Sequence, residues 1–120
     1  MARFPWITDP HLNFLSREQQ EAFLDQVNAR EPDGILVGGD IGEADTVVGF
    51  LRLMALWLDR PVYFVLGNHD YYRGAVQPVQ AEVSAICADV ESLIWLPDAG
   101  VVDLGEETAL VGHGGWADGR

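Results

Sequence analysis

The chain has 120 residues, enough for one domain of modest size with a hydrophobic core of its own. Its 19 acidic residues outnumber 7 Lys and Arg, and the formal net charge is −12 at pH 7. Such a charge argues against binding to a nucleic-acid backbone or an anionic membrane surface. It suits the binding of metal cations, but an acidic surface is more commonly just a solvated one, and we favour that interpretation of the charge.

Apolar runs alternate with helical patterns along the whole chain. Ser16 with Gln19 forms a capping box that predicts the start of the first helix, and Pro61 ends the second. The expected elements are a short apolar stretch at 4–8, a helix from the capping box to about residue 30, a strand at 35–37, a helix at 45–59, a strand at 62–66, a helix at 79–92, a strand at 94–96, and a hairpin with strands at 101–104 and 108–111.

This order of elements predicts an α/β fold. Strands that alternate with helices form βαβ units, so we expect a mixed, mainly parallel sheet with flanking helices, to which the hairpin adds an antiparallel portion. No repeat and no linker divides the chain, so residues 1–120 are interpreted as a single domain.

The amino terminus, the apolar runs and the cysteine content together predict a cytoplasmic location. The amino terminus lacks the apolar segment of a secretory signal, and the longest apolar run, at 53–58, is too short to span a membrane. The only cysteine, Cys87, cannot form a disulfide within the chain, and we interpret it as a small buried thiol on a helix.

Polar side chains stand where the first three predicted strands end. The first strand runs into Asp9 and His11, the second into Asp40, and the third into Gly67-Asn68-His69-Asp70. The carboxyl ends of parallel strands lie along one edge of a sheet, where ligands bind. The residues expected to meet there are Asp9, His11, Asp40, Asn68 and His69. Carboxylate, amide and imidazole groups together suit manganese, iron or zinc.

These three motifs together resemble the calcineurin-like metallophosphoesterases. Asp9-x-His11 and Gly39-Asp40 are weak signals by themselves, whereas Gly-Asn-His-Asp after an apolar strand is a strong one. Their order and their spacing of about thirty residues make the combination specific. The resemblance implies the first half of an α/β/β/α sandwich and a phosphoesterase that hydrolyses phosphomonoesters or phosphodiesters with a hydroxide activated by two divalent metal ions.

The resemblance also implies a role for each metal-site residue. Asp9 and His11 would hold the first metal ion, Asp40 would bridge both ions, and Asn68 would hold the second ion and contact the substrate phosphate. Taken singly, each residue has an ordinary structural alternative, since carboxylates and amides commonly cap helices or form turns. Five such coincidences at three strand ends favour the metal site.

The catalytic roles implied by the resemblance fall on the third motif. His69 would protonate the leaving-group oxygen, a task that suits an imidazole because it exchanges protons near neutral pH. Asp70 would orient His69 or pack beside it. Tyr71 and Tyr72 could flank a substrate, but we interpret them as packing or loop residues.

Two features indicate that the site is incomplete. The family's pattern continues with further histidines, whereas the third and last histidine here, His113, is interpreted as a loop residue near the rim of the site, with ligation left open. Trp116-Ala117-Asp118 resembles a segment that precedes the family's fourth motif. We therefore expect a domain truncated at its C-terminus that is weakly active or inactive alone.

Two functions of different classes follow from these observations. The first is a metal-dependent phosphoesterase, or a fragment that carries half of its site, acting on a phosphoester substrate. The alternative is a non-catalytic binding or scaffold domain that keeps the fold. A Rossmann-type nucleotide binder is disfavoured because no Gly-x-Gly-x-x-Gly turn follows the first strand. An uncovered sheet face and a free strand edge near 108–111 predict self-association.

Overall fold

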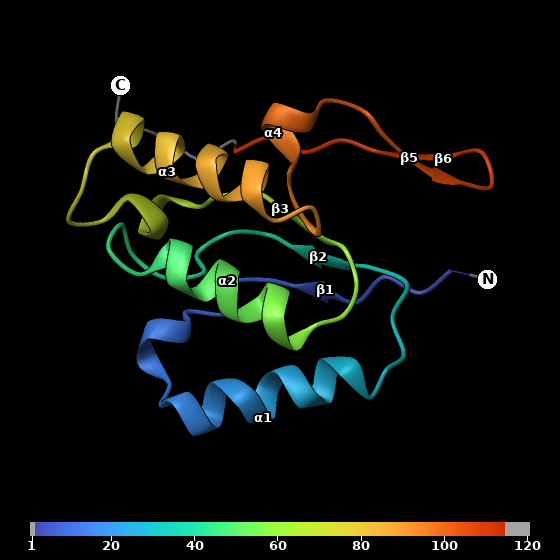
Figure 1. The fold of residues 1–120 in the computed structure, drawn as a ribbon, viewed down its shortest axis with the longest axis horizontal. Coiled ribbons are helices and arrows are strands. Elements are labelled where there is room, and N and C mark those ends of the chain that lie inside the picture. Colours follow the sequence, from blue (N-terminus) through green and yellow to red (C-terminus); the bar gives the residue numbers. More distant parts are fainter. Residues whose placement is uncertain (1, 115–120) are drawn as a thin grey trace.

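The computed structural model describes residues 2–114 and contains a four-stranded parallel sheet (Figure 1). The strands are β1 (Trp6–Ile7), β2 (Ile35–Val37), β3 (Val62–Phe64) and β4 (Leu93–Trp95). They lie in the order β1-β2-β3-β4, and each neighbouring pair is parallel. The predicted α/β class with a mainly parallel sheet is confirmed.

Three helices connect these strands. They are α1 (Arg17–Asn28), α2 (Val47–Trp57) and α3 (Val76–Asp89). In Figure 1 they lie side by side in chain order, and α2 contacts both α1 and α3. Because the strand order never reverses, right-handed crossovers place all three helices on the same face of the sheet.

The local sequence fits the observed starts of α1 and α3. Ser16 caps α1 as predicted: its Oγ accepts a hydrogen bond from the Gln19 N–H at 3.1 Å, and Gln19 Oε1 accepts one from the Ser16 N–H at 3.0 Å. Helix α3 begins at Val76, three residues before the predicted start. Its first turn accommodates Pro78 because the N–H groups of that turn have no partner within the helix.

The hydrophobic core lies between the helices and one face of the sheet. Alternate strand residues point into it, since side chains alternate across a strand. The strand contribution is Ile35, Val37, Val62, Phe64 and Leu93, and the helix contribution includes Leu24, Val27, Leu51, Met54, Val83 and Ile86. The opposite sheet face carries the half-buried Leu36, Tyr63 and Ile94.

The C-terminal part of the described chain forms a separate small sheet. A short helix, α4 (Leu96–Ala99), is followed by β5 (Val102–Gly105) and β6 (Thr108–Leu110), which pair with each other in antiparallel fashion. This hairpin projects away from the helices (Figure 1). The predicted antiparallel portion therefore exists, but it does not extend the parallel sheet.

Two further details complete the description of the fold. Short 3₁₀ helices, η1 (Leu12–Phe14) and η2 (Asn68–Tyr71), follow β1 and β3. Among residues 2–114, no helix has both the length and the apolar character required to cross a lipid bilayer.

Candidate metal centre

The loops that follow β1, β2 and β3 meet at the carboxyl edge of the parallel sheet. The first two are joined by backbone hydrogen bonds, since the His11 N–H donates to Asp40 O at 2.9 Å and the Leu12 N–H donates to Ile41 O at 2.8 Å. Buried Gln20 holds the end of the first loop, where its side-chain amide donates to the carbonyls of Leu12 and Leu15. These bonds fix the loop from which His11 projects.

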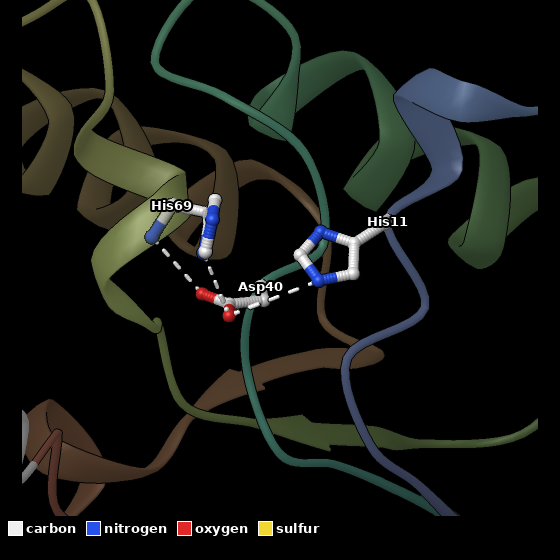
Figure 2. A group of neighbouring side chains, drawn as sticks. All are labelled: His11, Asp40 and His69. Atoms are coloured by element: carbon white, nitrogen blue, oxygen red, sulfur yellow. Dashed lines mark hydrogen bonds and ion pairs between the residues drawn. The ribbon is translucent and has the colours of Figure 1, made fainter.

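The carboxylate of Asp40 faces two imidazole rings (Figure 2). Its Oδ2 is 2.9 Å from His69 Nδ1 and 3.9 Å from His11 Nε2, while its Oδ1 accepts a hydrogen bond from the His69 backbone N–H at 3.0 Å. One ligand atom from each of the three residues lies within 4.8 Å of the others. The structure therefore brings together one residue from each of three strand ends.

The backbone at these residues is left-handed. Asp9, His11 and Asp40 have φ angles of 49°, 43° and 52°. Few non-glycine residues adopt this region, and Asp, Asn and His do so more readily than most. The three left-handed positions therefore fit the residue types found there.

Two glycines allow the second and third loops to approach each other. Gly39 has a φ of +101°, and a Cβ at this position would lie 2.7 Å from Gly67 N. A Cβ at Gly67 would overlap the Asp40 carboxylate and lie 2.8 Å from Asp40 N. Only residues without a side chain permit this contact, so both glycines support the position of Asp40.

The Asp70 side chain also links the loop after β2 to the loop after β3. Its side chain is fully buried, and Oδ1 accepts hydrogen bonds from the Ile41 and Gly42 N–H groups, each at 2.9 Å. Its Oδ2 accepts a third from the Gly67 N–H at 2.9 Å. These contacts are with the backbone, so Asp70 acts as a positioning residue in this geometry. Its predicted orientation of His69 stays a prediction.

Burial raises the pKa of Asp70 above its ordinary value of 3.8, because the carboxylate has lost its hydration. The three backbone N–H groups oppose this shift by stabilising the charged form, and the nearby negative charge of Asp40 adds to it. Desolvation is the larger effect.

Aromatic rings extend the histidine pair on both sides. The His11 and His69 rings meet edge to face, with centroids 4.9 Å apart. Beyond them, Phe14 lies 5.7 Å from His11 and Tyr72 lies 4.3 Å from His69. Phe14 is 76% exposed and Tyr72 is 45% exposed. Phe14 was not identified as a site residue from the sequence. The feature that could have indicated it is its position, three residues after the candidate ligand His11 and outside any predicted helix.

The remaining predicted residues are placed as follows. Asp9 is exposed and lies outside the group formed by His11, Asp40 and His69. Asn68 is half-buried and is the first residue of η2, separated by three residues from the end of β3 at Phe64. His113 is exposed and also lies outside the group. The segment 116–118 lies outside the described residues. The ligand roles of Asp9 and Asn68 therefore stay predictions.

The donor set fits a divalent transition metal. Ligand atoms sit about 2 Å from such an ion, so two of them face each other across one ion at about 4 Å. His11 Nε2 and Asp40 Oδ2, which lie 3.9 Å apart, are close to this spacing. Nitrogen and oxygen donors of these types suit zinc, iron or manganese.

A comparison with known families decides the assignment. The sequence pattern of the family described as calcineurin-like phosphoesterase matches residues 2–119. The chain belongs to the calcineurin-like phosphoesterase family. This confirms the resemblance carried by the three strand-end motifs. The family acts on phosphoesters and uses divalent metal ions, in agreement with the His and Asp group described above.

Individual relatives share about a third of their aligned residues with this chain. A bovine (Bos taurus) protein named "Transmembrane protein with metallophosphoesterase domain" is 32% identical over 129 residues, which covers 90% of this chain and 29% of the relative. An "Uncharacterized metallophosphoesterase" of Helicobacter pylori (strain ATCC 700392 / 26695) is 32% identical over 77 residues, covering 61% of this chain and 20% of the relative. The chain thus spans less than a third of these relatives. No solved structure matches it significantly.

Proposed function

We propose that this chain carries the amino-terminal part of a phosphoesterase site, in which His11 and Asp40, together with Asp9 and Asn68, hold divalent metal ions. The observation that carries the proposal is the convergence of His11, Asp40 and His69 from three separate strand ends onto one group of ligand atoms. Family membership supports the same reaction class.

Asp40 and His69 would have different roles at this site. Asp40 is the shared residue, since its two oxygens already contact His69 and lie near His11. His69 would donate a proton to the leaving-group oxygen, because it combines a half-exposed ring with a backbone fixed by Asp40. Bound metal ions would polarise the phosphoryl oxygens and activate the attacking water.

A non-catalytic binding domain is the second candidate. One observation favours it: within residues 2–114, the group of possible His, Cys, Asp and Glu ligands contains three members, and His113 is not among them. A second metal ion would depend on Asp40 and Asn68 from the described chain. In that case the chain would bind one ion and phosphate weakly, without turnover.

Calorimetric titration with Mn²⁺ or Zn²⁺ tests the proposal. The sharpest variant is Asp40→Asn, which keeps the size of the side chain and the tolerance for a left-handed backbone but removes the charge. We expect its metal affinity to fall by at least about tenfold. Asp89→Ala, which removes an exposed carboxylate at the end of α3, serves as the matched control and should bind normally.

The results separate the two candidates. Binding that depends on Asp40 and accompanies metal-dependent hydrolysis of an aryl phosphodiester supports the phosphoesterase. Binding that depends on Asp40 without detectable hydrolysis supports the binding domain. Metal binding that survives both Asp40→Asn and His11→Gln would overturn the assignment of the site.

A further inference from the structure

Tyr72 combines a fixed backbone with an exposed ring. Its N–H donates to His69 O at 3.0 Å, and its carbonyl accepts from the Ala44 N–H at 3.1 Å. The side chain remains 45% exposed, with its ring centroid 4.3 Å from that of His69. A ring held in this way offers a flat apolar face beside the site at a small cost in conformational entropy.

The position of Tyr72 beside His69 indicates which part of a substrate the Tyr72 ring would contact. If His69 donates a proton to the leaving-group oxygen, the leaving group lies beside the imidazole. Tyr72 is the ring next to that imidazole, whereas Phe14 lies on the opposite side, next to His11. A group attached directly to the leaving oxygen would thus lie closer to Tyr72 than to Phe14, the exposed ring beside the other site histidine.

We propose that Tyr72 is a stacking platform for the leaving group, and that the site prefers phosphoesters whose leaving group is an aromatic ring bonded directly to the ester oxygen. This inference rests on the proposed function, because it uses the role of His69. Stacked or tilted aromatic pairs have centroids 4.5–7 Å apart, so a ring beside the leaving oxygen falls within reach of the Tyr72 face. The chain's charge of −12 favours a small ester over a polyanion.

Two phosphates of similar size test the preference, compared at a pH well above both of their second pKa values so that both are dianions. Phenyl phosphate carries a flat aromatic ring, and cyclohexyl phosphate carries a puckered saturated one. Calorimetry on the Zn²⁺-saturated 120-residue chain is expected to show phenyl phosphate binding about tenfold more tightly, the factor typical of one ring stacked on an aromatic side chain. The NMR signals of the Tyr72 ring are expected to shift with phenyl phosphate and to move much less with cyclohexyl phosphate.

Three variants assign the preference to one ring. Tyr72→Leu should bind both phosphates equally, and Tyr72→Phe should keep the preference because it keeps the ring. Phe14→Leu is the matched control, since it removes another exposed ring beside a site histidine, and it should also keep the preference. If Tyr72 served only to orient His69, Tyr72→Leu would weaken both phosphates alike.

Each contrary outcome has a distinct meaning. Equal binding of the two phosphates by the unmodified chain overturns the stacking proposal and leaves the proposed function standing. Loss of the preference in Phe14→Leu instead of Tyr72→Leu also overturns it. Adenosine 5′-monophosphate binding more tightly than phenyl phosphate, in a Tyr72-dependent manner, overturns the direct attachment of the ring. Failure of inorganic phosphate to bind the Zn²⁺-saturated chain would overturn the proposed function itself, and this inference with it.

Discussion

Gly67 lies directly against the Asp40 carboxylate, so that a single added methyl group would overlap it. The contact joins the loop after β3 to the loop after β2. It shows that the position of Asp40 depends on a residue 27 positions away that has no functional group of its own. The site is therefore sensitive to changes that leave all of its ligands intact.

Gly67→Ala is expected to weaken metal binding. The backbone of Gly67 is extended and tolerates alanine, so the effect comes from displacement of Asp40 by the new Cβ. We expect a loss in Mn²⁺ affinity of at least about tenfold by calorimetry. Gly49→Ala is the control, because no atom lies within 4 Å of a Cβ there and the position is helical. It should bind metal normally and gain about 0.5–1 kcal/mol in stability. Equal metal affinities in both variants would contradict this account.

Asp70→Asn is expected to lower the free energy of unfolding of the metal-free chain by about 1–3 kcal/mol. The amide oxygen can still accept from Ile41 and Gly42, but its NH₂ group would face the Gly67 N–H and leave that partly buried donor unpaired. Urea unfolding of both proteins in EDTA measures the difference. A variant as stable as the unmodified chain would show that the three hydrogen bonds do not hold the loops together.

The difference in unfolding free energy between the unmodified chain and Asp70→Asn should change with pH in a defined direction. Burial raises the pKa of Asp70 in the folded chain, so the folded state binds its proton more tightly than the unfolded state does. Its contribution to stability is thus fully present below the ordinary, unfolded-state pKa of 3.8 and declines as the pH rises through the higher folded pKa. Asp70→Asn cannot titrate, so the advantage of the unmodified metal-free chain over the variant should shrink over that interval. A constant difference across it would contradict the raised pKa.

His69→Gln and His11→Gln are expected to separate catalysis from metal binding. Hydrolysis of an aryl phosphodiester by this chain should be slow, because the candidate metal group within residues 2–114 has three members, one of which is the proposed proton donor His69. Loss of a proton donor typically lowers a rate by about 100-fold or more, so His69→Gln should lose turnover while retaining its metal affinity. His11→Gln should lose both. Single-turnover assays and calorimetry measure the two properties, and a loss of metal binding in His69→Gln alone would reverse the assigned roles.

Self-association remains a prediction about the sheet face opposite the helices. Leu36, Tyr63 and Ile94 lie on that face, and apolar sheet surfaces promote association. Light scattering during size exclusion at micromolar concentration should detect a dimer. Ile94→Lys should reduce it, whereas Leu56→Lys, at an 83% exposed apolar position on α2, should not. A monomer that unfolds cooperatively would contradict this prediction.

The sequence alone determined the α/β class, the capping box of α1 and the family. These features depend on local patterns, namely the alternation of strands with helices, the Ser16 and Gln19 pair, and motifs that follow apolar strands. It also indicated that His11, Asp40 and His69 would meet, because parallel strands end at one edge of a sheet.

Only the tertiary structure decided the relationships between residues that lie far apart in the chain. The burial of Asp70 under backbone N–H groups, the contact between Gly67 and Asp40, and the edge-to-face contact between the His11 and His69 rings all depend on how three loops fold against one another. A sequence pattern specifies which strand end a residue occupies. The direction of its side chain and the neighbours that it meets are set by backbone angles and packing across the sheet edge, because no local pattern encodes the distance between separate loops.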